Sequence, residues 1–438
     1  MAENKDKKVL NVPNKREITP NELGSAEHKE VRLKRNVPNL RFKEFSGEWE
    51  ECRVSDLLDF YSTNSLSWDK LEYKSNNIMN LHYGLIHVGL PTMVDLSKDK
   101  LPTIIDDYVP RNYELCKEGD IVFADASEDT NEVAKAIEFY SLNGKNVVCG
   151  LHTIHGRDNN KTVVGFKGYA FASTSFHHQI RRIAQGTKVF SISTKNFSEC
   201  YIGIPTKDEQ RKIADFLRFI DERIATQNKI IEELKQLKNG IINHTFNSLK
   251  TKCTPFKNLY KDAGEGGTPS TSNASYYDNG TIPFIKIDDL KKKYLTCNKD
   301  YITNLGLQKS SAWLIPTNSI LFSNGATIGE ISITTYSVTT KQGILGIVPN
   351  SDVDTEYLYY LMSSQFFKKA INRIITEGTM KTAYLKDINK IICPLPSKEV
   401  QKNIARLPSI LNRKIEIEQS LLDKFLTQKQ HLLRQMFI

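Results

Sequence analysis

One segment of this chain is present twice. Residues 205–247 align without a gap on residues 396–438, at a shift of 191 positions. Conservative pairs such as Arg211 and Lys402 accompany the identities. The identical pairs are Pro205 and Pro396, Lys207 and Lys398, Gln210 and Gln401, Ile213 and Ile404, Ala214 and Ala405, Ile224 and Ile415, Lys238 and Lys429, and Phe246 and Phe437. An internal repeat constrains the fold more than composition does, because one architecture must accommodate both copies.

Each copy predicts a long helix with a coiled-coil seam, because its apolar residues alternate at spacings of four and three. Polar residues interrupt both seams at equivalent places, Gln227 and Lys238 in the first copy and Glu418 and Lys429 in the second. This match favours pairing of the two helices in one register. The residues predicted to pair are Ile213, Leu217, Ile220, Ile224, Ile231, Leu234 and Ile241 with Ile404, Leu411, Ile415, Leu422, Phe425 and Leu432. Two unrelated amphipathic helices on separate cores are the alternative.

Pro408 stands where the first copy has Leu217. A proline inside a helix removes a backbone hydrogen bond and clashes with the preceding turn. The sequence therefore predicts that the second helix breaks after a short first piece.

The repeated helices alternate with two globular segments. We expect a flexible charged extension over 1–38, globular domains over 39–204 and 251–395, and helices over 205–250 and 396–438. The predicted fold class is α+β, with two globular α/β domains separated by two long antiparallel coiled-coil helices and related by a pseudo-two-fold internal repeat. A helix of roughly 40 residues spans about 60 Å, so two such domains suit a partner with a long repeat, such as a DNA duplex.

The composition does not identify a binding partner, but it does indicate the cellular compartment. The net charge of +9, from 60 Lys+Arg and 51 Asp+Glu, is compatible with a polyanion without requiring one. The seven cysteines are scattered and never form Cys-x-x-Cys, so neither a metal site nor a disulfide framework is predicted. Apolar runs are too short for a membrane span. The prediction is a cytoplasmic protein that binds no membrane.

Catalytic motifs are missing from the sequence. It contains neither Gly-Lys-Ser/Thr for ATP nor Pro-Pro for an amino-methyltransferase. Two weaker features keep an enzyme hypothesis open. The acidic residues of 125–132 precede Lys135 as in some metal-dependent nucleases, and Gly264–Gly267 contains a Gly-x-Gly. An acidic loop and a plain loop are the simpler interpretations, so no catalytic residue is predicted.

Polar loops that mix amide, hydroxyl, basic and aromatic side chains recur in both globular segments. Such side chains bond base edges, while lysine and arginine suit phosphates. The candidates for DNA binding are His82, Tyr83, Ser127, His152, Arg181, Arg182, Thr187 and Lys188 in the first domain, and Thr268, Ser270, Lys286, Asn324, Thr327, Lys341, Gln342, Thr379 and Lys381 in the second.

With these motifs in view, the chain resembles the specificity subunits of type I restriction–modification systems, the HsdS family. The resemblance covers nearly everything from Leu40 to Ile438, and its most specific part is the doubled helix motif that opens with Pro205-x4-Gln210. The long extension before Leu40 and the proline at 408 depart from the family pattern. The other matching segments are 40–50, 119–129, 150–154, 266–271 and 282–287.

The resemblance implies that each globule is a target recognition domain that reads one half of a bipartite, asymmetric DNA sequence. It implies that the helices set the spacer and dock two methylation subunits, which carry S-adenosylmethionine, while two restriction (motor) subunits use ATP and Mg. The chain itself is expected to hold no cofactor. The alternatives are a stand-alone nuclease or methyltransferase, and a non-catalytic coiled-coil adaptor.

Overall fold

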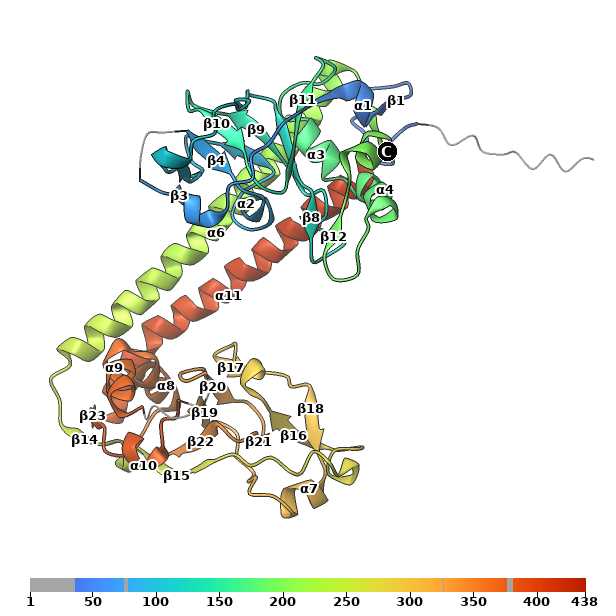
Figure 1. Cartoon of the computed structure of the whole chain (residues 1–438). Helices are drawn as coiled ribbons and strands as arrows, with labels where there is room; N and C mark the ends of the chain where they lie inside the picture. The colour runs from blue at the N-terminus through green and yellow to red at the C-terminus, as the bar shows by residue number, and fades with distance from the viewer. Residues whose placement is uncertain (1–35, 75–77, 326, 376–380) are drawn as a thin grey trace, which may run out of the picture. The chain divides into compact units, whose positions relative to one another are not determined.

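The computed structural model describes residues 36–74, 78–325, 327–375 and 381–438, and divides into two compact units (Figure 1). Unit 1 comprises Met1–Ile213 with Leu433–Ile438, and unit 2 comprises Ala214–Leu432. Most of the predicted N-terminal extension lies outside the described residues. Within the described part, no helix combines the length and apolar character needed to cross a bilayer.

Unit 1 is built on a five-stranded sheet of order β2-β11-β7-β9-β5 and a four-stranded sheet of order β10-β4-β6-β3. Apolar strands such as β7 are buried at every position. Two two-stranded pairs, β1-β13 and β12-β8, complete the unit. Its strands are β1 (Glu50–Arg53), β2 (Leu58–Tyr61), β3 (Leu71–Glu72), β4 (Met79–Leu81), β5 (Met93–Asp95), β6 (Thr103–Ile104), β7 (Ile121–Ala124), β8 (Ala126–Ser127), β9 (Ala136–Ser141), β10 (Val147–Cys149), β11 (Thr153–Asp158), β12 (Phe190–Ser191) and β13 (Tyr201–Ile204). Its helices are α1 (Val54–Leu57), η1 (Trp68–Lys70), α2 (Tyr83–His87), η2 (Asp106–Tyr108), α3 (Lys167–Phe171), α4 (Thr174–Ile183) and α5 (Thr194–Ser198).

Unit 2 repeats this plan. Its five-stranded sheet has the order β15-β22-β19-β20-β17, and its three-stranded sheet has the order β18-β16-β21. The pair β14-β23 corresponds to β1-β13. Its strands are β14 (Cys253–Pro255), β15 (Tyr260–Glu265), β16 (Ile282–Ile285), β17 (Tyr294–Leu295), β18 (Asp300–Ile302), β19 (Ile320–Ser323), β20 (Ile331–Thr334), β21 (Thr339–Thr340), β22 (Ile344–Pro349) and β23 (Ile392–Pro394). Its short helices are η3 (Phe256–Asn258), η4 (Ala274–Tyr276), η5 (Ile287–Asp289), α7 (Asn304–Gln308), α8 (Thr355–Ser363), α9 (Gln365–Ile374) and α10 (Leu385–Ile388).

The two five-stranded sheets share every strand direction. In each, three antiparallel pairings are followed by one parallel pairing at the edge, β5 with β9 and β17 with β20. The turn before the central strand requires a positive φ in both units, and Gly119 and Asn318 adopt it at +85° and +60°. Glycine and asparagine tolerate this left-handed conformation better than other residues. The globular segments are therefore two copies of one α/β domain.

The repeated segments form the long helices α6 (Lys207–Ser248) and α11 (Lys398–Gln435). The predicted seam positions of both helices are buried or half-buried, while most of their neighbours are exposed. Inside unit 2 the helices run antiparallel. Gln227 Nε2 donates to the carbonyl and the carboxylate of Glu418, while Lys238 bonds to Asn412 and Lys429 to Asp221.

The prediction that Pro408 breaks the second helix is wrong. The helix α11 continues through Pro408, whose ring is buried. The next residue ties this turn to the domain, because the Ser409 hydroxyl bonds to the carboxylate of Glu356 and accepts from Lys293 Nζ at 2.9 Å. Burial of the ring and these side-chain bonds offset the lost backbone hydrogen bond.

Each unit fixes the start of one long helix by the same glutamine. In unit 1, Gln210 Oε1 accepts from the backbone N–H of Val163 at 2.8 Å, and its Nε2 donates to the Pro205 carbonyl at 2.8 Å. In unit 2, Gln401 accepts from Asp354 N–H at 2.7 Å and donates to the Pro396 carbonyl at 2.9 Å. The identical glutamines of the repeat therefore hold identical helix starts.

The end of the opposite helix packs into each unit through a repeated phenylalanine. Phe246 lies against Tyr357 in unit 2 at a ring distance of 5.6 Å, and Phe437 lies against Phe166 in unit 1 at 5.9 Å. The C-terminus is held there too, since Ser175 Oγ donates to the carbonyl of Ile438 at 3.0 Å. Each domain core thus contains the start of one long helix and the end of the other.

Candidate nucleic-acid interface

In unit 1 the loops that follow β7 and β10 meet. The backbone N–H of Asp125 donates to the carbonyl of His152 at 3.1 Å. The Asp125 carboxylate also lies 3.1 Å from Nδ1 of the exposed His152 ring. The positive φ of His152, +53°, turns the chain sharply at this point. The loop pair places a carboxylate and an imidazole side by side at the end of the sheet.

A row of neighbouring rings runs from this loop pair, with the exposed His152 at one end and the exposed Trp68 at the other. Ring centroids lie 5.3 Å apart for His152 and Tyr83, 4.7 Å for Tyr83 and His82, and 4.5 Å for His82 and Trp68. Trp68 is 45% exposed. Exposed rings of this kind offer π-faces to unpaired bases and apolar contact to thymine methyl groups.

His82 itself is buried and cannot reach a base. Its Nδ1 accepts from the backbone N–H of Gly84 at 3.2 Å and caps α2, so its role is to hold the neighbouring Tyr83. Burial, and then the nearby His152, lower the pKa of His82 and favour its neutral form. The structure thus removes His82 from the surface candidates.

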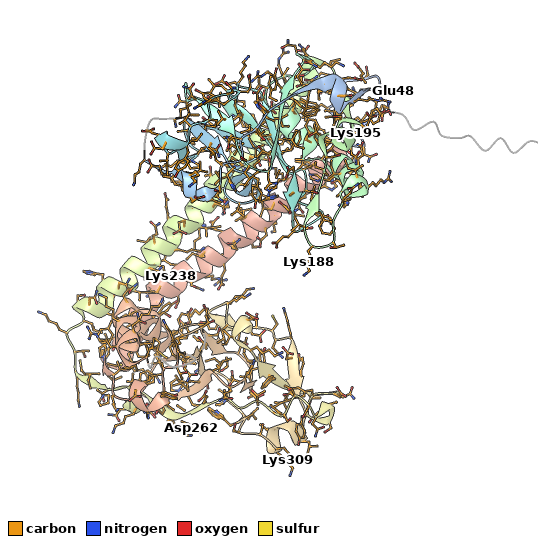
Figure 2. All side chains as sticks on the ribbon, viewed as in Figure 1. Glu48, Lys188, Lys195, Lys238, Asp262 and Lys309 are labelled. Atoms are coloured by element: carbon orange, nitrogen blue, oxygen red, sulfur yellow. The ribbon has the colours of Figure 1, made fainter. Side chains whose placement is uncertain are left out.

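The basic candidates of unit 1 gather beside the same loops. Strand β12 pairs with β8 so that Phe190 faces Ser127, which brings the 185–189 loop next to the half-buried Ser127. Arg181 Nη1 donates to Asn131 Oδ1 at 2.9 Å and so contacts the loop that follows Ser127. Arg182, Thr187 and Lys188 are exposed, and Figure 2 shows Lys188 on a loop that projects from the unit.

In unit 2 four polar loops converge at the equivalent end of the sheet. The backbone N–H of Asn324, after β19, donates to the Gly343 carbonyl at 3.0 Å, and its carbonyl accepts from Ala383 N–H at 2.9 Å. The backbone N–H of Gln342 donates to Thr268 Oγ1 at 3.3 Å. These bonds bring together the loops that contain Thr268, Asn324, Gln342 and the segment from Lys381.

We call the places where these loops meet, at Asp125 in unit 1 and at Asn324 in unit 2, the loop junctions. The two loop junctions are equivalent. Asp125 in unit 1 receives a backbone bond from Ile192 and donates one to His152, as Asn324 does with Ala383 and Gly343. The turn residues His152 and Gly343 both have positive φ. Each domain therefore presents its candidate residues at the same structural position.

Exposure sorts the remaining candidates of unit 2. Asn324 is buried, with Nδ2 donating to the Ala383 carbonyl at 3.2 Å, so its side chain holds the loops together and does not reach a base. Thr268 is half-buried, and Lys286 pairs with Asp300 at 2.8 Å. Thr379 lies outside the described residues. Exposed to solvent are Ser270, Lys286, Thr327, Lys341, Gln342 and Lys381.

Sequence reasoning missed several residues that complete this surface. Trp68, Asn131 and His178 touch predicted residues, the last through a 2.8 Å contact between its Nδ1 and Arg181. Trp68 could have been predicted from the sequence, because a tryptophan in a polar, serine-rich stretch is typical of a contact surface. Asn131 and His178 could not have been predicted, since only tertiary packing brings them near Arg181.

The two features that kept an enzyme hypothesis open have structural explanations. Asp125 pairs with His152, and Glu132 pairs with Lys135 at 2.8 Å. The Gly-x-Gly lies partly in β15 instead of a loop, and a Cβ on Gly266 would come within 2.2 Å of Thr340. Close packing thus accounts for that glycine without a bound nucleotide.

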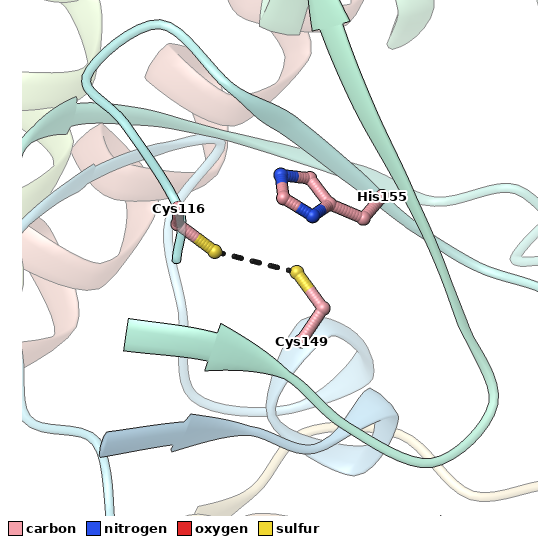
Figure 3. Close-up of side chains that lie close together, drawn as sticks. All are labelled: Cys116, Cys149 and His155. Carbon is pink, nitrogen blue, oxygen red and sulfur yellow. Dashed lines mark hydrogen bonds between the residues drawn. The ribbon is translucent and has the colours of Figure 1, made fainter. Parts of the chain in front are cut away.

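Over the residues that the structure describes, the one group of three or more metal-ligating side chains with converging atoms is Cys116, Cys149 and His155 (Figure 3). It lies in the core of unit 1, away from the acidic loop that resembled a nuclease site. The sequence predicts no metal site because these three residues form no Cys-x-x-Cys motif.

Comparison with known proteins identifies a family for both domains. The family model described as "Type I restriction modification DNA specificity domain" matches residues 47–236 and 261–425. The chain is 32% identical over 162 residues to the type I restriction enzyme MjaIX specificity subunit of Methanocaldococcus jannaschii, a match that covers 36% of this chain and 37% of that one. It is 23% identical over 410 residues to the putative MjaX specificity subunit of the same organism, covering 87% and 91%.

A solved structure shares the fold. The type I restriction–modification S subunit from M. genitalium aligns with 92% of this chain and 99% of its own, at 15% identity and a TM-score of 0.54. Because the family model matches most of the chain, in two segments that correspond to the two observed domains, the assignment does not rest on one motif. The chain belongs to the family of type I restriction–modification DNA specificity domains and contains that domain twice.

Proposed function

We propose that this chain is the DNA-specificity subunit of a type I restriction–modification complex. Each α/β domain reads one half of a bipartite, asymmetric DNA target, and α6 and α11 set the length of the unread spacer. The observation that carries this proposal is the repetition of one domain with an equivalent loop junction at Asp125 and Asn324. The loops around the two junctions differ in residues, which suits two different half-sites.

The proposed readout uses exposed side chains around each junction. Arg182 and Lys188 in unit 1, and Lys341 and Lys381 in unit 2, are placed to contact phosphates. The exposed side chains of Gln342, His152 and Trp68 suit base edges. Electrostatic contacts of this kind make the affinity fall steeply with salt.

The long helices are proposed to dock two methylation subunits, with two restriction subunits joining the complex. Their outer faces expose large apolar residues, including Phe219 at 55%, Ile410 at 56% and Ile417 at 55%. A groove of 430 Å³ beside Phe219 is lined by Phe219, Leu421 and Phe425 together with the polar residues Glu222, Arg223, Thr226 and Gln227. Exposed apolar patches on paired helices are typical of protein–protein contacts.

The chain is proposed to hold no cofactor of the reactions. S-adenosylmethionine for adenine methylation, and ATP with Mg for translocation and cleavage, belong to the partner subunits. The chain directs where these reactions occur and supplies no reacting group. We place it in the cytoplasm, where host DNA is methylated.

Domain exchange tests this proposal. Residues 39–204 are replaced by the corresponding domain of a subunit with a different target, and the methylated sequence is read after co-expression with the methylation subunits. We expect one half of the recognised sequence to change. Exchange of residues 251–395 is the matched control and should change the other half. A change of both halves in either chimera would contradict independent readout.

A further inference from the structure

Two cysteines and a histidine from separate elements meet inside unit 1 (Figure 3). Cys149 ends β10, His155 belongs to β11, and Cys116 lies in the loop that leads to β7. The two sulfur atoms are 3.4 Å apart, and all three ligand atoms lie within 4.8 Å of one another. The exposed fractions are 5% for Cys116, 2% for Cys149 and 0% for His155.

The histidine is oriented by a buried carboxylate. Its Nε2 lies 2.7 Å from Oδ2 of Asp120, and Arg157 donates to both oxygens of the same carboxylate at 2.9 Å. Because the carboxylate accepts, the ring proton sits on Nε2 and the lone pair sits on Nδ1. The Nδ1 atom is buried and has no hydrogen-bond partner. In Figure 3 the edge of the ring that carries Nδ1 is directed toward the two sulfur atoms.

We propose that Cys116, Cys149 and His155 bind one thiophilic divalent metal ion of the zinc class. A carboxylate that holds the far nitrogen of a ligating histidine is the usual support of such a ligand, because it sets the tautomer and the direction of the ring. The unpaired Nδ1 of His155 then acquires a partner. The three residues come from parts of the chain that no short spacing motif links, so they escape motif-based detection.

The geometry and the charge both suit Zn²⁺. With Zn–S of about 2.3 Å and Zn–N of about 2.0 Å, a tetrahedral site needs S···S of about 3.8 Å and S···N of about 3.5 Å. The observed S···S distance of 3.4 Å is close to this value, and the 4.8 Å limit on all three atoms brackets the S···N distance. Binding releases the two thiol protons, so that Zn²⁺ with two thiolates and a neutral imidazole buries no net charge.

A fourth ligand can come from solvent. A pocket of 410 Å³ reaches Cys149 and is lined by polar residues that include Asn64 and Glu114. A water molecule in this pocket would complete a four-coordinate ion. The metal would tie together β10, β11 and the segment before β7, so its expected effect is to stabilise the fold of unit 1 independently of DNA binding.

The test uses the purified full chain under reducing conditions. Zinc content is measured by mass spectrometry, and the metal-free protein is titrated with Co²⁺, whose absorption reports thiolate ligands and tetrahedral geometry. We expect about one Zn²⁺ per chain, a sulfur-to-cobalt charge-transfer band and intense visible bands. Cys116→Ser and Cys149→Ser should each lose most of the bound metal. Cys200→Ser, which alters another buried cysteine of unit 1, should retain it.

The cobalt spectrum of the unaltered chain keeps the test decisive even where a variant fails to fold. Absence of the charge-transfer band in the unaltered chain would overturn the proposal. Equal metal loss in Cys200→Ser would do the same, because it would place the ion elsewhere. In a second preparation made without reductant, titration of the unfolded protein should detect all seven cysteines as thiols. Detection of five, with a bond mapped between Cys116 and Cys149, would identify an oxidised pair and contradict the metal site.

Discussion

Lys238 of α6 donates to the side-chain oxygen of Asn412 of α11 at 3.2 Å. The equivalent residues of the repeat, Lys429 and Asp221, form an ion pair at 2.6 Å. The two contacts lie on either side of Gln227 and Glu418, which are themselves equivalent and face each other. The helix pair is therefore symmetric about the Gln227–Glu418 contact, and one of its two outer contacts has lost its negative charge.

Replacing Asp221 by asparagine should make the two outer contacts alike and lower stability. The side chains of Asp221 and Lys429 are each 19% exposed, so their pairing is only partly screened. The variant replaces an ion pair by a bond from the charged Lys429 to a neutral acceptor, and such partly exposed pairs contribute up to about 1 kcal/mol, so we expect a loss of at most that size in the free energy of unfolding. Urea denaturation measures it. The control Asp215→Asn alters an exposed carboxylate near Arg218 and should change stability little; equal losses in both variants would contradict the interpretation.

The half-buried Lys238 predicts a pH dependence. Burial, and then the nearby Lys293, lower its pKa below the ordinary value of 10.5. Between the folded and unfolded pKa values the unfolded chain binds more protons, so the free energy of unfolding should rise as pH increases toward 10.5. Lys238→Met should remove this rise, and Lys235→Met, at an exposed position, should keep it. Denaturation at pH 7.5 and pH 9.5 compares them, and identical pH profiles for wild type and Lys238→Met would refute the shift.

The Gln227–Glu418 contact should fix the register of the helix pair. Gln227→Leu removes a donor from the buried Glu418 side chain and should lower the urea midpoint. The double variant Gln227→Leu/Glu418→Leu should recover or exceed wild-type stability, because an apolar seam replaces a buried polar pair. It should also reduce fidelity for the spacer length, as polar seam residues specify register. A double variant less stable than the single one would contradict this role.

Lys188 should contribute to DNA affinity through phosphate contact. It lies on the projecting loop of unit 1, whereas Lys195, equally basic and exposed, lies elsewhere on the unit (Figure 2). Lys188→Ala should weaken binding to all sequences and reduce the slope of log affinity against log salt by about 1. Lys195→Ala is the control and should leave the slope unchanged. Equal slopes for the Lys188 variant and wild type would remove that residue from the interface.

The helix pair was predictable from the sequence because its apolar residues recur at a regular spacing. The seam, the antiparallel order and the polar interruption at Gln227 and Glu418 follow from spacing and repetition. The repeat in fact extends further than the helices. At the same shift of 191 positions, Ser173 and Ser364 cap α4 and α9, and their hydroxyls accept from the backbone N–H groups of Phe176 and Phe367. This second match is short and interrupted by divergent loops, so it was not recognised from the sequence.

Other features depend on tertiary packing that spacing does not encode. Pro408 was expected to break α11, yet its buried ring and the bonds of Ser409 keep the helix continuous. His82 and Asn324 have the chemistry of base contacts, but both hold loops from inside the domain. Cys116 and His155 are 39 positions apart in the chain, and they come together through the pairing of β11 with β7 and through the backbone bond from Cys116 to Val147 of β10.

In the proposed function, this chain selects the sequence at which a partner methylates DNA. The most direct measurement is a genome-wide map of methylated adenines in the host, with and without this gene, while the methylation subunit is expressed in both. We expect the loss of one asymmetric, two-part motif and its return when the gene is restored. An unchanged map, with the methylation subunit present and active, would contradict it.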